Sequence, residues 1–199
     1  MRKKTLFIGL FLIGLLGFMS FQLSMGLAEQ KGTAAKKKAI VERGKWLVNL
    51  GGCNDCHSPK VFTPQGPIPD TTKLLSGYPA HLKLPEVPAG VIAPDKWGAL
   101  ATNDLTGWAG PWGVSLGSNL TPEILTGLGS WTDEMFVKAM RTGKHMGEGR
   151  DILPPMPWPG YAQLSDDDLK AIFAYLKSLK PIENAVPDPI PPAGQMPPK

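Results

Sequence analysis

The spacing of apolar residues along the chain predicts three helices. They cover residues 36–50, 132–142 and 165–180, and each carries apolar side chains three or four positions apart, which places them on one face. These faces consist of Ile40, Gly44, Leu47 and Val48, then Phe136, Val137 and Met140, then Leu169, Ile172, Phe173, Leu176 and Leu179.

Capping residues support the second and third of these helices. Thr132 and Ser165 each precede acidic residues, and a hydroxyl at that position can accept a hydrogen bond from a free amide of the first turn. Gly143 is predicted to end the second helix, because glycine readily adopts the left-handed conformation found there. Pro181 is predicted to stop the third helix, since proline has no amide hydrogen with which to continue it.

Two other stretches lack such a pattern. Residues 58–129 are rich in Gly, Pro and Trp, and residues 181–199 contain seven prolines. We expect irregular backbone in the first stretch and an extended arm in the second. Irregular segments of this length are uncommon in a compact domain, so the first stretch needs something else to supply a core.

The amino terminus has the pattern of an export signal. Basic residues precede an uncharged apolar run from Leu6 to Met19, and a weaker apolar stretch continues to Ala28. The segment is expected either to be cleaved after Ala28 or to remain as a membrane anchor over residues 6–28, which are long enough to span a bilayer. Both outcomes predict a periplasmic protein, either soluble or anchored to the inner membrane.

The charge of the remaining chain excludes one class of partner. The formal net charge is +4, but residues 1–28 hold three of the 21 basic side chains and none of the 17 acidic ones. The rest of the chain is therefore nearly neutral, and nucleic-acid binding loses its electrostatic support.

Both cysteines fall in one pentapeptide, residues 53–57, with the sequence CNDCH. In a helical turn, residues at positions i, i+3 and i+4 share a face, so Cys53, Cys56 and His57 converge. Two thioether bonds to a porphyrin and one imidazole bond to iron can then form together, which is the pattern of covalent haem attachment. One haem c is therefore predicted, and its apolar macrocycle would supply the core that residues 58–129 lack.

Three alternatives would use the same cysteines. A thioredoxin-like redox pair expects a βαβ pattern around it, which the sequence lacks. A zinc site would need further ligands, but His81 and His145 show no ligand spacing. A disulfide between Cys53 and Cys56 would close a small, strained loop.

Iron bound by His57 needs a ligand on its other side. Met156 is favoured because it lies in the proline-rich run from Leu153 to Pro159, whose fixed dihedrals hold a side chain in place at low entropic cost. Its thioether is a soft ligand that favours ferrous iron. The other candidates are Met135, Met140, Met146, Met196, His81 and His145.

With these residues the chain resembles the class I cytochrome c family, and more closely the haem domains of periplasmic dehydrogenase-linked cytochromes. Besides the CNDCH motif, the resemblance rests on RGKWLV at 43–48, SNLTP at 118–122, WTDE at 131–134, PMP at 155–157, LSDDDL at 164–169 and YL at 175–176. It implies an all-α, cytochrome c-like fold of three or more helices around a covalently bound haem, with long irregular Gly/Pro-rich loops.

The resemblance also implies roles for single residues. His57 and Met156 would be the iron ligands, and a proline carbonyl, of Pro59 or Pro67, would accept a hydrogen bond from the His57 imidazole. The first and last helices would cross. Gly44 agrees with a crossing, because glycine within a helix costs about 1 kcal/mol relative to alanine and is expected where the last helix, at Phe173 or Tyr175, comes close.

The implied function is an electron carrier rather than an enzyme. Single electrons would pass between periplasmic or membrane redox partners, such as a dehydrogenase, a respiratory complex or a terminal oxidase. Alternatively, the chain is a fixed electron-accepting subunit of a periplasmic dehydrogenase or respiratory complex. A haem enzyme or gas sensor with an open distal site would require that Met156 not bind iron. The expected organisation is a signal peptide or anchor over 1–28, a cytochrome c domain over 36–180 and a Pro-rich tail over 181–199.

Overall fold

The computed structural model describes residues 29–192. The predicted signal or anchor over 1–28 and the candidate ligand Met196 lie outside these residues. Within the described part of the chain, no helix is long and apolar enough to cross a membrane. The chain divides after Ile40 into two units, and the fold described below is that of the second.

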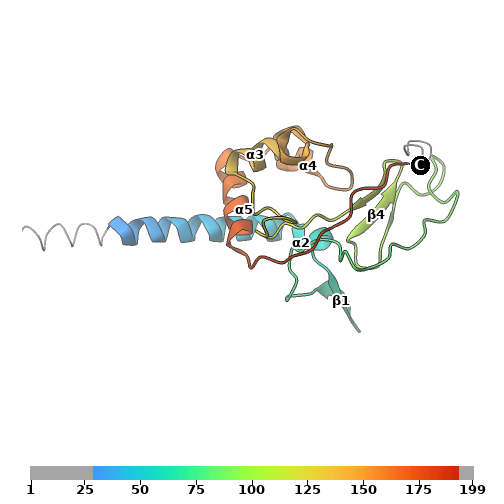
Figure 1. Ribbon diagram of the computed structural model, residues 1–199, viewed down its shortest axis with the longest axis horizontal. Coiled ribbons are helices and arrows are strands. Elements are labelled where there is room, and N and C mark those ends of the chain that lie inside the picture. Colours follow the sequence, from blue (N-terminus) through green and yellow to red (C-terminus); the bar gives the residue numbers. More distant parts are fainter. Residues whose placement is uncertain (1–28, 193–199) are drawn as a thin grey trace, which may run out of the picture. The chain divides into compact units, whose positions relative to one another are not determined.

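All three predicted helices are confirmed. Within the described residues the first helix covers 29–50, and the polar residues 29–35 lie outside the range that the apolar pattern predicted. It is followed by α2 (Cys53–His57), α3 (Asp133–Thr142), the 3-10 turn His145–Gly147, α4 (Trp158–Tyr161) and α5 (Asp166–Ser178) (Figure 1).

The predicted caps are also present. The hydroxyl of Thr132 accepts a hydrogen bond from the amide of Met135 at 3.3 Å, and that of Ser165 accepts one from Asp168 at 3.1 Å. Gly143 ends α3 with a φ of 67°. The last helix stops at Ser178, earlier than the pattern predicted.

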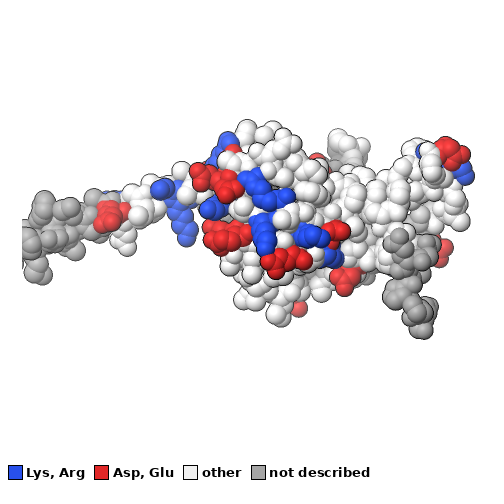
Figure 2. Space-filling model, turned by 90° about the horizontal axis from the view of Figure 1, so that it is seen from above, with Lys and Arg blue, Asp and Glu red and all other residues white. Residues whose placement is uncertain are grey.

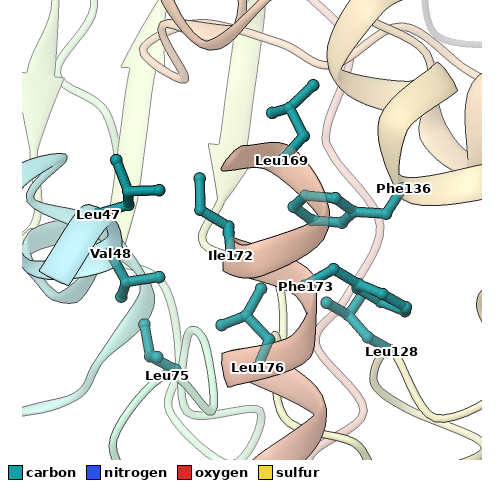
Figure 3. Packing of buried hydrophobic residues seen from close by; sticks show 9 residues of the cluster. All are labelled: Leu47, Val48, Leu75, Leu128, Phe136, Leu169, Ile172, Phe173 and Leu176. Atoms are coloured by element: carbon teal, nitrogen blue, oxygen red, sulfur yellow. The ribbon is translucent and has the colours of Figure 1, made fainter. Parts of the chain in front are cut away.

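The hydrophobic core is built mainly from the first helix, α3 and α5. Figure 3 shows the side chains of α5 between those of the other two helices, and the rings of Phe136 and Phe173 stack with their centroids 5.1 Å apart. The cluster consists of Leu47, Val48, Leu75, Leu128, Phe136, Leu169, Ile172, Phe173 and Leu176.

Gly44 lies against the backbone of α5. A Cβ built at this position would meet the carbonyl oxygen of Ala171 at 1.8 Å and the Cβ of Tyr175 at 2.9 Å. The predicted close approach of the two helices is therefore confirmed, with Tyr175 rather than Phe173 at the contact.

The stretch over 58–129 was expected to be irregular, but it contains five short strands. They are β1 (Lys60–Thr63), β2 (Gly66–Pro69), β3 (Leu100–Ala101), β4 (Gly107–Gly110) and β5 (Gly113–Leu116). The first two form an antiparallel hairpin, and the last three form an antiparallel sheet in the order β3-β4-β5.

The all-α prediction therefore describes the helical core but is incomplete. The sequence pattern does not predict these strands, because their residues do not alternate between apolar and polar. The middle of β1, at Val61 and Phe62, is exposed on both faces, and the buried positions of β4 are Gly107 and Ala109. Small or exposed residues leave no period of two in the sequence.

Residues 181–192 run in extended conformation and are bound to the preceding fold. The Asn184 side chain accepts a hydrogen bond from the Ala80 amide at 3.0 Å and donates to the carbonyls of Ser76 and Tyr78 at 2.7 and 2.8 Å. Further along, Ile190 forms an antiparallel bridge with Val114. This part of the chain is thus fixed by side-chain and backbone hydrogen bonds without burying a core of its own.

Charged side chains of both signs lie interspersed on the face drawn in Figure 2. Two ion pairs in the described part of the chain join helices. Arg43 of the first helix contacts Asp168 at 2.8 Å, and Arg141 of α3 pairs with Asp166. Each such exposed pair contributes little, on the order of 1 kcal/mol or less, but both join a helix to the start of α5.

Acid sensitivity is expected at Asp104, which lies between β3 and β4. Its carboxylate accepts hydrogen bonds from the hydroxyls of Thr102 and Thr106 at 2.6 and 2.7 Å. Burial opposes ionisation, but these bonds outweigh it and lower the pKa of Asp104. A lowered pKa in the folded state stabilises the protein above about pH 4, and this contribution is lost as the pH falls through the folded value.

Asp104→Asn is expected to lower the free energy of unfolding at pH 7 by about 1–2 kcal/mol, since the carboxylate is only half-buried. Denaturant titrations at pH 7 and pH 3.5 would measure this loss and its decrease in acid. Asp95→Asn, at an exposed position, is the control and should behave as wild type. Equal loss at both pH values would contradict the assignment.

Candidate functional site

The two cysteines and His57 lie in α2, a five-residue helix directly after the first helix. Gly52, with a φ of 65°, turns the chain between the two helices. Both thiols are free. The helical turn expected from the CNDCH motif is therefore present, and its i, i+3 and i+4 positions share one face.

The imidazole of His57 is oriented by a backbone carbonyl. Its Nδ1 lies 2.8 Å from the carbonyl oxygen of Ser118. Because a carbonyl can only accept, Nδ1 carries the hydrogen, and the lone pair of Nε2 is left available to a metal. Burial lowers the pKa of His57, so the ring is neutral at pH 7. These properties fit an axial ligand of haem iron.

The expected acceptor for this hydrogen bond was wrong. Pro59 or Pro67 was predicted, but the carbonyl of Ser118 accepts the bond, while that of Pro59 accepts the Asp70 amide at 2.8 Å. The sequence did hold a sign of this acceptor. The SNLTP stretch at 118–122 resembles the family, but no role was assigned to it.

The backbone around Ser118 is fixed against α2. A Cβ on Gly117 would meet the carbonyl oxygen of Cys56 at 2.1 Å, so only glycine permits this approach. The Gly117 amide donates to the Thr106 carbonyl at 2.8 Å. On the other side, the Gly77 amide donates to the His57 carbonyl at 2.7 Å. Both the ring and the backbone of His57 are thereby held by segments distant in sequence.

The thiols sit in surroundings that keep them protonated. Burial raises the pKa of both Cys53 and Cys56. The hydroxyl of Tyr161 donates to the Gly51 carbonyl at 2.6 Å, and burial followed by the neighbouring Cys53 raises the pKa of Tyr161. A thioredoxin-like pair relies instead on a lowered thiol pKa, so this alternative does not match the site.

Met156 lies in the loop before α4, and both ends of that loop are tied to segments adjoining α2. At one end, the hydroxyl of Ser115 donates to the Pro154 carbonyl at 2.5 Å. Ser115 is two residues before Gly117, which lies against Cys56. At the other end, Tyr161 of α4 reaches the chain at Gly51, next to the attachment turn.

The other candidate ligands within the described residues have different surroundings. Met140 packs against the hydrophobic core. The ring of His145 meets Trp131 edge to face, with centroids 5.0 Å apart. Met146 and His81 are exposed. Met135 lies in α3 and is partly buried.

No protein-family model matches the chain. It is 31% identical over 151 residues to the gluconate 2-dehydrogenase cytochrome c subunit of Pantoea cypripedii, covering 75% of this chain and 26% of the relative. It is 28% identical over 154 residues to the cytochrome c subunit of the quinone alcohol dehydrogenase of Gluconobacter oxydans, covering 76% and 24%. A nicotinate dehydrogenase subunit of Pseudomonas putida is 28% identical over 156 residues, covering 78% and 10%.

The attachment turn, the oriented imidazole and these similarities together define a c-type cytochrome domain. More particularly, it is a monohaem domain with one covalent haem c, similar to the cytochrome c subunits of dehydrogenases. The chain spans about a quarter or less of the length of these relatives. Electron transfer is the chemistry of such a domain.

Proposed function

We propose that this chain carries single electrons between redox partners through a haem c attached at Cys53 and Cys56 and ligated by His57 and Met156. The observation that carries the proposal is the hydrogen bond from His57 Nδ1 to the Ser118 carbonyl, which leaves the lone pair of Nε2 available to iron. When bound, the haem supplies an iron that cycles between ferrous and ferric states.

The chain's own residues hold and tune this group. Cys53 and Cys56 fix the macrocycle through thioether bonds. The bond from His57 to Ser118 sets the ring orientation and increases the basicity of Nε2. Met156, from a loop held by hydrogen bonds at Pro154 and Tyr161, would supply the second protein ligand to the iron and so keep substrates from the metal. This is the arrangement of an electron carrier rather than that of a haem enzyme.

The proposed organisation follows the sequence pattern. Residues 1–28 direct export and are either cleaved or retained as an anchor, residues 36–180 form the cytochrome domain and residues 181–199 form the tail. The protein then works in the periplasm. Its proposed partners are a dehydrogenase as electron donor and a respiratory complex or terminal oxidase as acceptor.

A second candidate is a fixed electron-accepting subunit of a dehydrogenase complex. It is favoured by the similar proteins, several of which are cytochrome subunits of dehydrogenases. Affinity purification of the tagged, exported chain separates the two candidates. A stoichiometric dehydrogenase in the eluate indicates the subunit, and a single soluble species indicates the carrier.

The haem assignment is tested on the exported full chain. Intact-mass spectrometry is expected to show one covalently bound haem, and carbon monoxide should not bind the reduced protein because both axial positions are filled. A chain with Cys53 and Cys56 both changed to serine should carry no covalent haem. Rapid carbon monoxide binding to the reduced wild type would contradict ligation by Met156.

A further inference from the structure

The side chain of Lys60, the first residue of β1, folds back over the end of α2. Its Nζ donates hydrogen bonds to the carbonyl oxygens of Asn54 at 3.0 Å, Asp55 at 2.9 Å and Ser58 at 2.6 Å. An ammonium group has three donors, and all three are used here. No pattern in the sequence indicates a role for this lysine.

These contacts satisfy carbonyls that the helix cannot. The last four carbonyls of a helix have no partner within it, and α2 has only five residues. The carbonyl of His57 is taken by the Gly77 amide, and those of Asn54 and Asp55 are taken by Lys60. A cation at this end also complements the helix dipole. Lys60 thus closes the turn that presents the haem-binding side chains.

The charge of Lys60 is partly withdrawn from water and acts on the site. Its side chain is half-buried, and among residues 29–192 it has no carboxylate within ion-pair distance. Asn54 and Asp55 precede Cys56, and Ser58 follows His57, so the ammonium group that contacts their carbonyls lies beside the turn that holds the His57 ring. A positive charge there disfavours a further positive charge on a metal bound to the ring.

We propose that Lys60 is a positioning residue that caps the haem-attachment helix and raises the reduction potential of the iron bound by His57. This rests on the attachment and ligation proposed above. The positioning follows from the three carbonyl contacts, and the raised potential follows because an added electron is stabilised by a nearby cation in partly buried surroundings.

Three variants of the full, haem-loaded chain test the proposal. Lys60→Met keeps much of the side-chain length but removes the donors and the charge, and Lys60→Arg keeps both. Lys73→Met removes one charge at an exposed position of the same region and serves as the control. Redox titration and denaturant unfolding are measured on each protein, with the haem content determined by mass.

Lys60→Met is expected to have a lower reduction potential and a lower unfolding midpoint than wild type. Lys60→Arg should recover most of the potential, and Lys73→Met should match wild type in both measurements. A Lys60→Met protein that carries haem with unchanged potential and midpoint overturns the proposal while leaving haem attachment intact. Equal shifts in the Lys60 and Lys73 variants also overturn it, since the effect would then be one of net charge.

If Lys60→Met does not acquire haem, the arginine variant shows whether the charge and donors of residue 60 are needed or only the packing of the lysine side chain. If Lys60→Arg matures with a potential close to wild type, the donors and charge of residue 60 are required, as proposed. If neither variant acquires haem while Lys73→Met does, the proposal is overturned, because the lysine side chain would then be needed for its packing. A wild type without covalent haem would instead refute the proposed function.

Discussion

Met156→Ala is expected to open one axial position of the iron without releasing the haem. The oxidised variant should lose the sulfur–iron charge-transfer band. The reduced variant should bind carbon monoxide stoichiometrically, where the wild type binds none. Its reduction potential should fall, because the soft thioether favours ferrous iron. Optical titration and redox potentiometry of the purified protein measure all three effects.

The matched control for this experiment is Met146→Ala. Met146 is 39% exposed and lies beyond α3 in the 3-10 turn His145–Gly147. Its loss should leave the spectra and the reduction potential unchanged. If Met146→Ala rather than Met156→Ala opened the iron to carbon monoxide, the assignment of the sixth ligand would have to be exchanged between the two residues.

Gly44→Ala is expected to destabilise the fold by about 2–4 kcal/mol. Helix propensity alone would stabilise the variant by about 1 kcal/mol. However, the new methyl group would stand 1.8 Å from the carbonyl oxygen of Ala171, which belongs to the α5 backbone and cannot rotate away. The two helices would have to separate, and overpacking of this kind commonly costs about 1–3 kcal/mol or more.

Gly32→Ala provides the control within the same helix. A Cβ at residue 32 meets no atom within 4 Å, so this variant should be neutral or slightly stabilised. Denaturant unfolding followed by circular dichroism compares the two. Equal stability of the Gly44 and Gly32 variants would show that the first helix and α5 can separate at no cost. That result would contradict the close contact of Gly44 with the α5 backbone.

Local features of the fold could be predicted well from the sequence. The helices around Leu47, Phe136 and Ile172 each carry an apolar face, and the hydroxyls of Thr132 and Ser165 cap the next turn as expected. The interactions concerned join residues three or four positions apart. They are therefore encoded within a short window and depend little on the remainder of the chain.

The short strands and the contacts of the extended tail could not be predicted in the same way. The buried positions of β4 are Gly107 and Ala109, which give no apolar alternation. The hydrogen bonds of Asn184 to Ser76 and Tyr78 join residues more than 100 positions apart. Nothing in the proline-rich sequence around Asn184 indicates which carbonyl groups its side chain will contact.

The sequence by itself determined that Cys53, Cys56 and His57 share one helical turn, which is the spacing that covalent haem attachment requires. Only the tertiary structure decided how His57 is held. The acceptor of its Nδ1 hydrogen is Ser118, 61 positions away, and not a nearby proline. The physical reason is that covalent spacing fixes which side chains share a turn, whereas a backbone carbonyl is offered by any residue, and only folding selects the one that comes within reach.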